Sequence, residues 1–281
     1  MLAAALLFST GGAAIKACSL SSWQVASFRS AVAALVVLAI LRESRRRWSG
    51  RTLAVGFAYA ATMVLFVVAN KLTTAANTIF LQYTAPLYLV VAGPLLLDEP
   101  LRRRDVVFLA IAGGSLALFF VDASVQSASA PRPALGNALA LLSGVSWAAT
   151  ALGLRWMARP DSGGAPVATA VACGNLVAFL ACLPMALPVK AATGLDAPLI
   201  LYLGVFQIGG AYFFLTRGLR SVPVLEASLL LLLEPVLNPV WAWIVHGERP
   251  GPWSLVGGAI LLVATTVKTW DDSARAMRTA A

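Results

Sequence analysis

Two stretches of the chain, LQYTAPLYLVVAGPLLLDE at residues 81–99 and LLLLEPVLNPVWAWIVHGE at residues 230–248, decide the fold. Both are apolar runs that hold a proline and end in a glutamate. A shift of 149 residues places Pro86 on Pro235 and Glu99 on Glu248. Because the paired residues occur in the same order, the match indicates that one structural unit occurs twice in the chain.

A second match extends the repeat to the beginning of the chain. A shift of 139 residues places Phe8 on Trp147 and Lys16 on Arg155, so an aromatic residue is followed by a basic one at the same spacing. Loop insertions explain why the two shifts differ. We therefore predict a first repeat at residues 1–121, a second repeat at residues 134–270 and a cytoplasmic tail at residues 271–281.

The composition excludes a soluble fold. Apolar residues make up 59% of the chain and charged residues only 12%, whereas about a quarter of the residues in a soluble domain are charged. The mean hydropathy is +0.82. The net charge of +9 comes from short basic clusters between apolar runs. Such clusters suit loops that face anionic lipid, so a nucleic-acid partner is not expected.

Apolar windows long enough to cross the ~30 Å hydrocarbon core of a bilayer occur ten times. They cover residues 2–18, 22–41, 52–69, 73–96, 105–121, 135–157, 166–187, 198–216, 223–245 and 252–270. Each repeat then has five helices, an odd number, so the second repeat enters the membrane from the opposite side. The predicted fold is an all-α membrane protein in which two inverted five-helix repeats surround a central cavity. That symmetry is typical of transporters, whose sites lie near midplane between the repeats.

The basic residues predict the orientation, because Lys and Arg are enriched in cytoplasmic loops. With both termini cytoplasmic, the external segments hold only Lys71, Arg132, Lys190 and Arg249. The internal segments then hold Arg42, Arg45, Arg46, Arg47, Arg51, Arg102, Arg103, Arg104, Arg155, Arg159, Arg217, Arg220, Lys268, Arg275 and Arg278.

The repeat pattern resembles a known family. Trp147 with a basic residue eight positions later, and a proline in spans four and nine followed by an acidic residue at the helix end, are similar to the twin EamA-type repeats of the drug/metabolite transporter superfamily. Within it the chain most resembles the YddG-type aromatic amino-acid exporters of bacterial inner membranes. The resemblance implies a cavity lined by spans 1, 3, 4, 6, 8 and 9 that opens alternately to either side. Phe8 departs from the tryptophan usual in the family, which weakens any contact assigned there.

A charged residue in the middle of a span is costly and marks a functional candidate. Glu234 is the clearest case, and Asn238 and Trp241 follow it on the same helical face. We expect these three residues to bind substrate; the alternative is a glutamate buried only for packing. Pro235 and its counterpart Pro86 each remove a backbone hydrogen bond and are expected to act as hinges.

The fourth span carries too many polar side chains for all of them to face lipid. The substrate-binding candidates here are Asn77, Thr78, Gln82, Tyr83 and Tyr88. On a continuous helix Asn77 and Tyr88 share one face, whereas Gln82 and Tyr83 point elsewhere. Hydrogen bonding between helices is the alternative for each of them.

Trp147 lies too deep in the sixth span to anchor at the membrane interface. It is expected to form a wall on which a substrate stacks, with core packing as the alternative. Further candidates in the middle of spans are Tyr59, Gln207 and Tyr212. Arg29, in the second span, is expected to snorkel outward or to pair with an acid. Lys16 and Arg155 end their helices and are expected to lie outside the site, whereas Glu248 is expected to make a cap and gate contact.

These features predict alternating-access export of small metabolites, and amino acids with aromatic or apolar side chains fit best. Aromatic walls would accept the side chain, while hydroxyl and amide groups would hold the ammonium and carboxylate. The alternative is efflux of hydrophobic cationic drugs. A membrane-embedded enzyme or a sensor is disfavoured, because HExxH and GxSxG are absent and the chain has one histidine, His246.

We accordingly expect no enzyme activity, no cofactor and no bound metal. The expected partners are a small-molecule substrate and the lipid bilayer of a bacterial-type inner (plasma) membrane, with the protein as a monomer. The sequence leaves open which metabolite is carried, whether protons are coupled to its movement and in which direction it moves.

Overall fold

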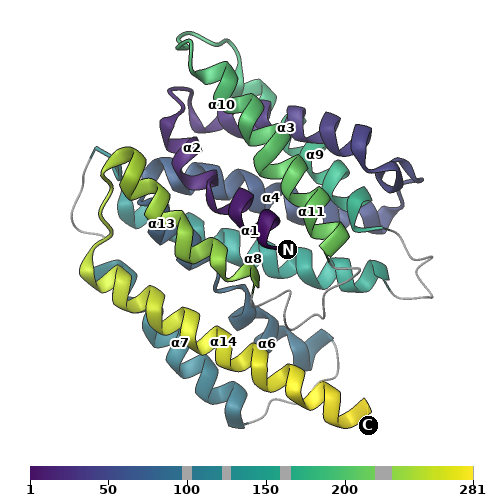
Figure 1. The fold of residues 1–281 in the computed structure, drawn as a ribbon, viewed down its shortest axis with the longest axis vertical. Helices are drawn as coiled ribbons and strands as arrows, with labels where there is room; N and C mark the ends of the chain where they lie inside the picture. Colours follow the sequence, from purple (N-terminus) through teal and green to yellow (C-terminus); the bar gives the residue numbers. More distant parts are fainter. Residues whose placement is uncertain (97–102, 122–127, 159–165, 219–229, 281) are drawn as a thin grey trace.

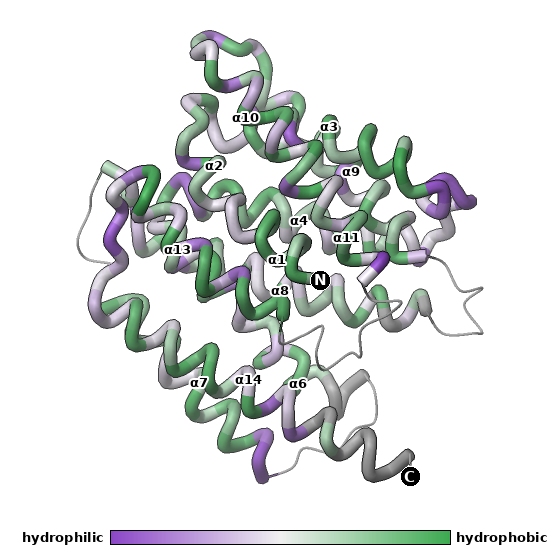
Figure 2. Tube along the Cα trace, in the orientation of Figure 1, coloured by the Kyte–Doolittle hydropathy of each residue, from purple (hydrophilic) through white to green (hydrophobic). Residues whose placement is uncertain are grey.

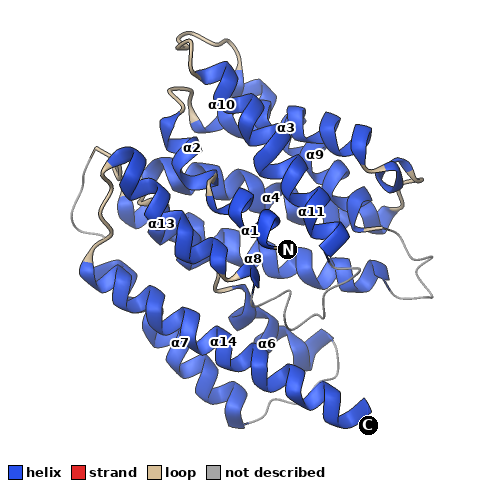
Figure 3. Cartoon of the chain, in the orientation of Figure 1, coloured by secondary structure: helices blue, strands red, loops and turns tan. Residues whose placement is uncertain are grey.

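The computed structural model describes residues 1–96, 103–121, 128–158, 166–218 and 230–280, and every helix or strand assigned in these ranges is a helix (Figure 3). The first repeat contains α1 (Leu2–Ser9), α2 (Gly11–Ala17), α3 (Ser22–Ile40), the short 3-10 helix η1 (Arg42–Arg45), α4 (Gly50–Leu72), α5 (Ala75–Gln82), α6 (Ala85–Leu96) and α7 (Arg103–Val121). The second contains α8 (Pro133–Ala158), α9 (Val167–Ala186), α10 (Asp196–Tyr202), the π-helix η4 (Leu203–Gly210), α11 (Ala211–Gly218), α13 (Leu233–His246) and α14 (Pro252–Ala280).

Eight helical segments within the described ranges are long and apolar enough to cross a membrane. They correspond to eight of the ten predicted spans. The first predicted span is the shorter apolar segment Leu2–Ala17, which is interrupted at Thr10. The ninth corresponds to α13, and the part of it at residues 223–229 lies outside the described residues. The all-helical membrane fold is thus confirmed.

The starts of α3 and α4 follow from their local sequences. The Ser21 hydroxyl accepts a hydrogen bond from the backbone N–H of Gln24, and the Gln24 side-chain oxygen accepts one from the backbone N–H of Ser21. Ser49 and Thr52 form the same reciprocal arrangement at the start of α4. Such capping boxes satisfy backbone donors that a helix start leaves free. Between these two helices, hydrophilic residues gather in the turn that contains η1, whereas the helices themselves are mostly hydrophobic (Figure 2).

α4 lies at the centre of the bundle and packs against α8 and α9 of the other repeat (Figure 1). Small residues allow this close approach: a Cβ added to Gly56 would stand 2.6 Å from the Cys173 sulfur, and one added to Gly174 would stand 2.8 Å from the Gly56 carbonyl oxygen. Close backbone approach at small residues is how membrane helices gain contact without a hydrophobic driving force.

A second close contact joins η4 to α3. A Cβ added to Gly204 would stand 2.5 Å from Val32, and one added to Gly209 would stand 2.4 Å from Val36. Two glycines five residues apart in η4 therefore leave room for two valines four residues apart in α3. In contrast, α7 and α14 pack against each other along one side of the molecule (Figure 1). Lys268 and Asp105 join them at 2.9 Å.

Candidate functional site

The break in the first span is where helices of both repeats meet. The Ser9 and Thr10 hydroxyls donate to carbonyl oxygens of their own turn, both at a distance of 2.7 Å. The Trp241 indole N–H, from α13, donates to the Ser9 hydroxyl over 2.9 Å. Tyr202 of α10 shares a 2.8 Å hydrogen bond with Thr10. Polar side chains from the second repeat thus hold the point at which the first helix is interrupted.

Two amide side chains lie against α2 just after this break. Gln207, in η4, donates to the Phe8 carbonyl oxygen at the limiting distance of 3.5 Å, and its Oε1 is buried without a hydrogen-bond partner among the described residues. Asn238 is fully buried against Gly12, whose missing side chain leaves the space that it occupies. Neither polar atom of the Asn238 amide has a partner in the described part of the chain. Buried amides of this kind are available to a ligand.

The fourth span is broken as well, and its polar residues point to different helices. α5 ends at Gln82, and α6 begins at Ala85. The Gln82 amide donates to the Ser143 hydroxyl of α8 over 2.8 Å. The Tyr83 hydroxyl donates to Glu234 Oε2 over 2.9 Å and lies 3.1 Å from the Leu231 carbonyl oxygen. Asn77 donates to Asn137 over 3.2 Å, and Thr78 bonds the Thr74 carbonyl one turn back. Tyr88 is half-buried on α6.

Pro86 and Pro235, the two prolines predicted as hinges, each follow a helix interruption and do not bend a continuous helix. Each proline lies in the first turn of a new helix, α6 or α13, where a missing backbone N–H leaves no intrahelical bond unmade. The interruption comes before the proline, at Tyr83 and Thr84 in one repeat and at Leu232 in the other. Glu234 is consequently an acid in the first turn of α13, where the helix dipole favours negative charge. The proline inside α13 is Pro239.

Four aromatic side chains from four spans gather in one cluster, which we call the aromatic cluster: Phe8, Tyr59, Trp147 and Tyr212. The Tyr212 ring lies edge-on to Phe8, with centroids 5.3 Å apart, and to Tyr59, with centroids 5.9 Å apart. Trp147 packs against the same group. Three of the predicted candidates therefore meet, together with Phe8.

For two polar residues beside this cluster, the sequence did not predict the position that the structure shows. Arg29 is 1% exposed, so it does not snorkel outward, and no carboxylate pairs with it among the described residues. Its Nη2 donates to the Met63 carbonyl oxygen over 3.0 Å. Asn175 was not a candidate at all; its amide lies 3.4 Å from the Tyr59 hydroxyl. The signal that could have identified it is an amide side chain in the middle of an otherwise apolar helix.

One end of the bundle is closed by a buried ion pair. Lys16, at the end of α2, lies 3.1 Å from Glu248, in the turn after α13, and the two side chains are 6% and 1% exposed. Lys16 also donates to the carbonyl oxygens of Thr73 and Ser129, over 2.8 and 2.5 Å. The Ala75 backbone N–H, at the start of α5, donates to Glu248 over 2.5 Å. We call this the ion-pair end. The residues Arg155 and Glu99 that match Lys16 and Glu248 by the repeat have side chains outside the described residues.

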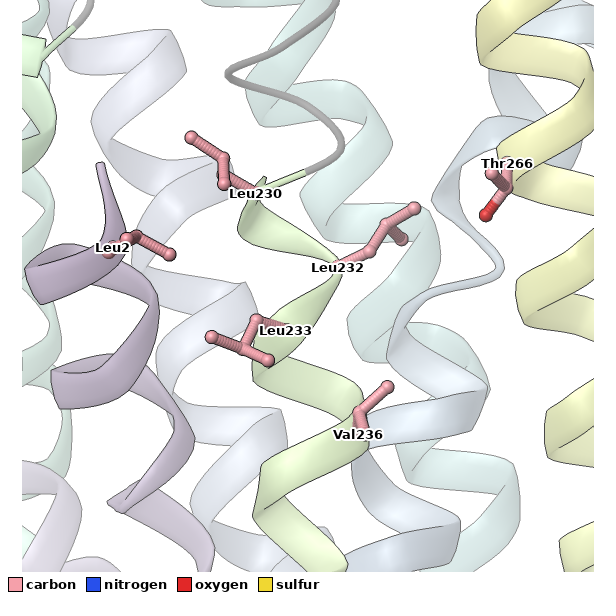
Figure 4. Close-up of a pocket in the computed structure, with 6 residues that line it drawn as sticks. All are labelled: Leu2, Leu230, Leu232, Leu233, Val236 and Thr266. Atoms are coloured by element: carbon pink, nitrogen blue, oxygen red, sulfur yellow. The ribbon is translucent and has the colours of Figure 1, made fainter.

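The opposite end holds an apolar groove of about 350 Å³ between α1, α13 and α14 (Figure 4). Its lining is Leu2, Leu230, Leu232, Leu233, Val236 and Thr266. The Thr266 hydroxyl is occupied by the Leu262 carbonyl oxygen one turn back, over 2.7 Å. The groove therefore offers hydrocarbon surface, and we call this the groove end.

The fold and the site define a multi-pass helical membrane protein of the transporter class, with polar and aromatic side chains of both repeats gathered in its interior. The profile of the EamA-like transporter family matches residues 1–121 and 134–269, and the chain belongs to this family.

Two curated relatives support the same assignment. Both are the pseudopaline exporter CntI, from Pseudomonas aeruginosa strains UCBPP-PA14 and PAO1, and both are 25% identical over 268 residues, which cover 93% of this chain and 91% of theirs. A crystal structure of a protein that is 20% identical superposes with a TM-score of 0.62 over 94% of this chain and 93% of that one. That likeness concerns the fold.

Proposed function

We propose that the protein exports small zwitterionic metabolites, amino acids with aromatic or apolar side chains, by alternating access. The observation that carries the proposal is the aromatic cluster, in which rings from spans 1, 3, 6 and 8 meet inside the bundle. Offset and edge-on aromatic surfaces accept a flat or branched apolar side chain with a favourable stacking contribution. Membership of a transporter family and two relatives named as exporters support movement out of the cell.

Polar residues elsewhere in the interior would supply the rest of a metabolite site. Tyr83 and Glu234 form a hydrogen-bonded pair between the two repeats, and Asn238 and Gln207 keep polar atoms without partners in the described structure. Hydroxyl, amide and carboxyl groups that converge near an apolar surface are what an orienting metabolite site needs. We extend the proposal to topology: both termini are cytoplasmic, and the ion-pair end faces outward.

The test is counterflow in proteoliposomes with purified protein. The panel contains phenylalanine, tyrosine, leucine, alanine, serine, a hydrophobic quaternary amine and pseudopaline, the substrate named for the relatives. We expect phenylalanine, tyrosine and leucine to exchange faster than alanine and serine. Exchange of the quaternary amine alone would support the drug-efflux alternative, to which Glu234 could contribute the counter-charge. Exchange of pseudopaline alone would replace the amino-acid assignment with that substrate.

A further inference from the structure

Among the described residues, a cation without a carboxylate partner and an amide oxygen without a hydrogen-bond donor lie near Tyr59. Arg29 is a guanidinium with five N–H donors. The described residues give it the Met63 carbonyl oxygen at 3.0 Å and the Met63 sulfur at 3.7 Å, while its Nε has no partner. The Asn175 side chain is fully buried, donates to the Val171 carbonyl oxygen over 2.9 Å, and leaves its Oδ1 without a partner.

Tyr59 connects the two groups. Its hydroxyl lies 3.4 Å from the Asn175 amide nitrogen, and the Met63 carbonyl that Arg29 binds is one turn further along the same helix, α4. Its ring also lies edge-on to that of Tyr212 in the aromatic cluster, with centroids 5.9 Å apart. An unmatched donor with positive charge and an unmatched acceptor therefore both lie near one tyrosine, at the edge of the cluster.

This pattern is complementary to the head group of an amino acid. A carboxylate accepts charge-assisted hydrogen bonds and neutralises a buried guanidinium, and Arg suits it because its donors form a planar fork. An ammonium group donates to an amide oxygen. An unpaired ion inside a membrane bundle is costly and is retained where it serves a ligand or an ion pathway.

We propose that Arg29 and Asn175 form the head-group subsite of the transported amino acid, Arg29 binding its carboxylate and Asn175 its ammonium. The inference rests on the proposed function and deepens it. The substrate side chain lies against the aromatic cluster. Tyr212 covers Tyr59 in this structure, with the rings 5.9 Å apart, so the subsite fills when Tyr212 moves with α11. Glu234 is outside this subsite.

The experiment compares four related compounds as competitors of labelled phenylalanine in proteoliposomes: phenylalanine, its methyl ester, phenylpropionate and phenethylamine. The ester and phenethylamine lack the carboxylate, and phenylpropionate lacks the ammonium. For the wild-type protein we expect phenylalanine to compete about 10- to 100-fold better than the compounds without a carboxylate, as expected for a charged hydrogen-bonding partner. Equal competition by phenylalanine and its ester would overturn the proposal without any variant.

Two variants separate the subsite from a structural role. In Arg29→Gln the preference for phenylalanine over its ester should fall at least tenfold, and Arg29→Lys should restore part of it. In Asn175→Leu the preference for phenylalanine over phenylpropionate should fall. Asn70→Leu is the matched control, because Asn70 is equally buried, bonds the carbonyl one turn back and also has an unpartnered Oδ1.

The outcomes are distinct. Loss of transport with unchanged preferences in the Arg29 and Asn175 variants would show that both residues only support the fold, and would overturn the subsite. If the Arg29 variants do not fold, the wild-type comparison with the ester still decides. A wild-type protein that carries the quaternary amine but no amino acid would instead refute the proposed function.

Discussion

The two ends of the bundle differ in the kind of side-chain contact that they contain. At the ion-pair end, Lys16 and Glu248 are buried 3.1 Å apart, and the Lys16 ammonium donates to two backbone carbonyl oxygens. At the groove end, five of the six lining residues are aliphatic, and the sixth satisfies its own hydroxyl. Directional bonds are lost together when one partner moves, whereas aliphatic contacts change gradually. The comparison suggests that the ion-pair end switches between two states and that the groove end adapts.

The sharpest way to test the comparison is to ask which side of the membrane each end faces. In a background without its three buried cysteines, single cysteines would replace Arg45, Arg217, Arg132 and Lys190, which are all exposed. We expect an impermeant reagent added to intact cells to label positions 132 and 190 only. Labelling of all four positions from one side would refute the inverted repeat.

The next largest effect should come from breaking the ion pair. Lys16→Met leaves Glu248 buried and unpaired, and we expect the free energy of unfolding in detergent to fall by about 3–5 kcal/mol. The double variant Lys16→Met/Glu248→Leu should be more stable than the single one, because no buried charge remains. Val236→Ala, at the half-exposed groove, is the control and should cost less than about 1 kcal/mol.

If the double variant were as unstable as the single one, packing rather than charge would hold the ion-pair end, and the two ends would not differ in the way described. Counterflow in the double variant adds a functional measurement. We expect its rate to fall even where stability returns, because the charges that reseal the end after release are gone.

A smaller effect is expected from a substitution in the aromatic cluster, which lies between the two ends. Trp147→Ala should weaken exchange of phenylalanine and leucine more than that of serine, since the stacking contact contributes about 0.5–1.5 kcal/mol beyond area burial. Trp243→Ala is the matched control, because Trp243 is 55% exposed on α13. An equal loss for every substrate, in step with reduced expression, would mean that Trp147 serves packing.

The smallest effect is expected at Glu234. It lies close to the groove end and bonds Tyr83, and the matching residue of the first repeat is Ala85, so the described structure offers no paired acid for a proton relay. We expect Glu234→Gln to retain most of the flux, because an amide can still accept the Tyr83 hydrogen bond. Flux would be measured with and without an imposed pH gradient. A strong response in the wild-type protein that the Gln variant lacks would make Glu234 the proton site.

The sequence predicted the fold well because apolar length and an internal repeat are linear properties of the chain. It named Tyr59, Trp147 and Tyr212 as separate candidates in the middle of spans, but that their side chains meet is seen only in the structure. It failed where the helix was not continuous. The face shared by Asn77 and Tyr88 was derived for one helix, and the break at Tyr83 and Thr84 changes the directions of the residues around it.

Pairings across the bundle were beyond the sequence for a different reason. Lys16 and Glu248 are far apart in the chain, and each could be assigned a local role, so only the tertiary arrangement shows that they bind each other. Arg29 was expected to reach water or an acid because a buried cation without a counter-ion is the least favourable arrangement. Within the described residues the structure has that arrangement, and helix periodicity carries no signal for it.

The contact between η4 and α3 interlocks the two helices at a defined register. Val32 and Val36 fit the notches left by Gly204 and Gly209, and they stand about 6 Å apart along α3 at a rise of 1.5 Å per residue. A slide of one helical turn would match only one of the two valines to a glycine and would leave the other without the space that it needs. The contact therefore favours one register between η4 and α3, directly before α11 and Tyr212.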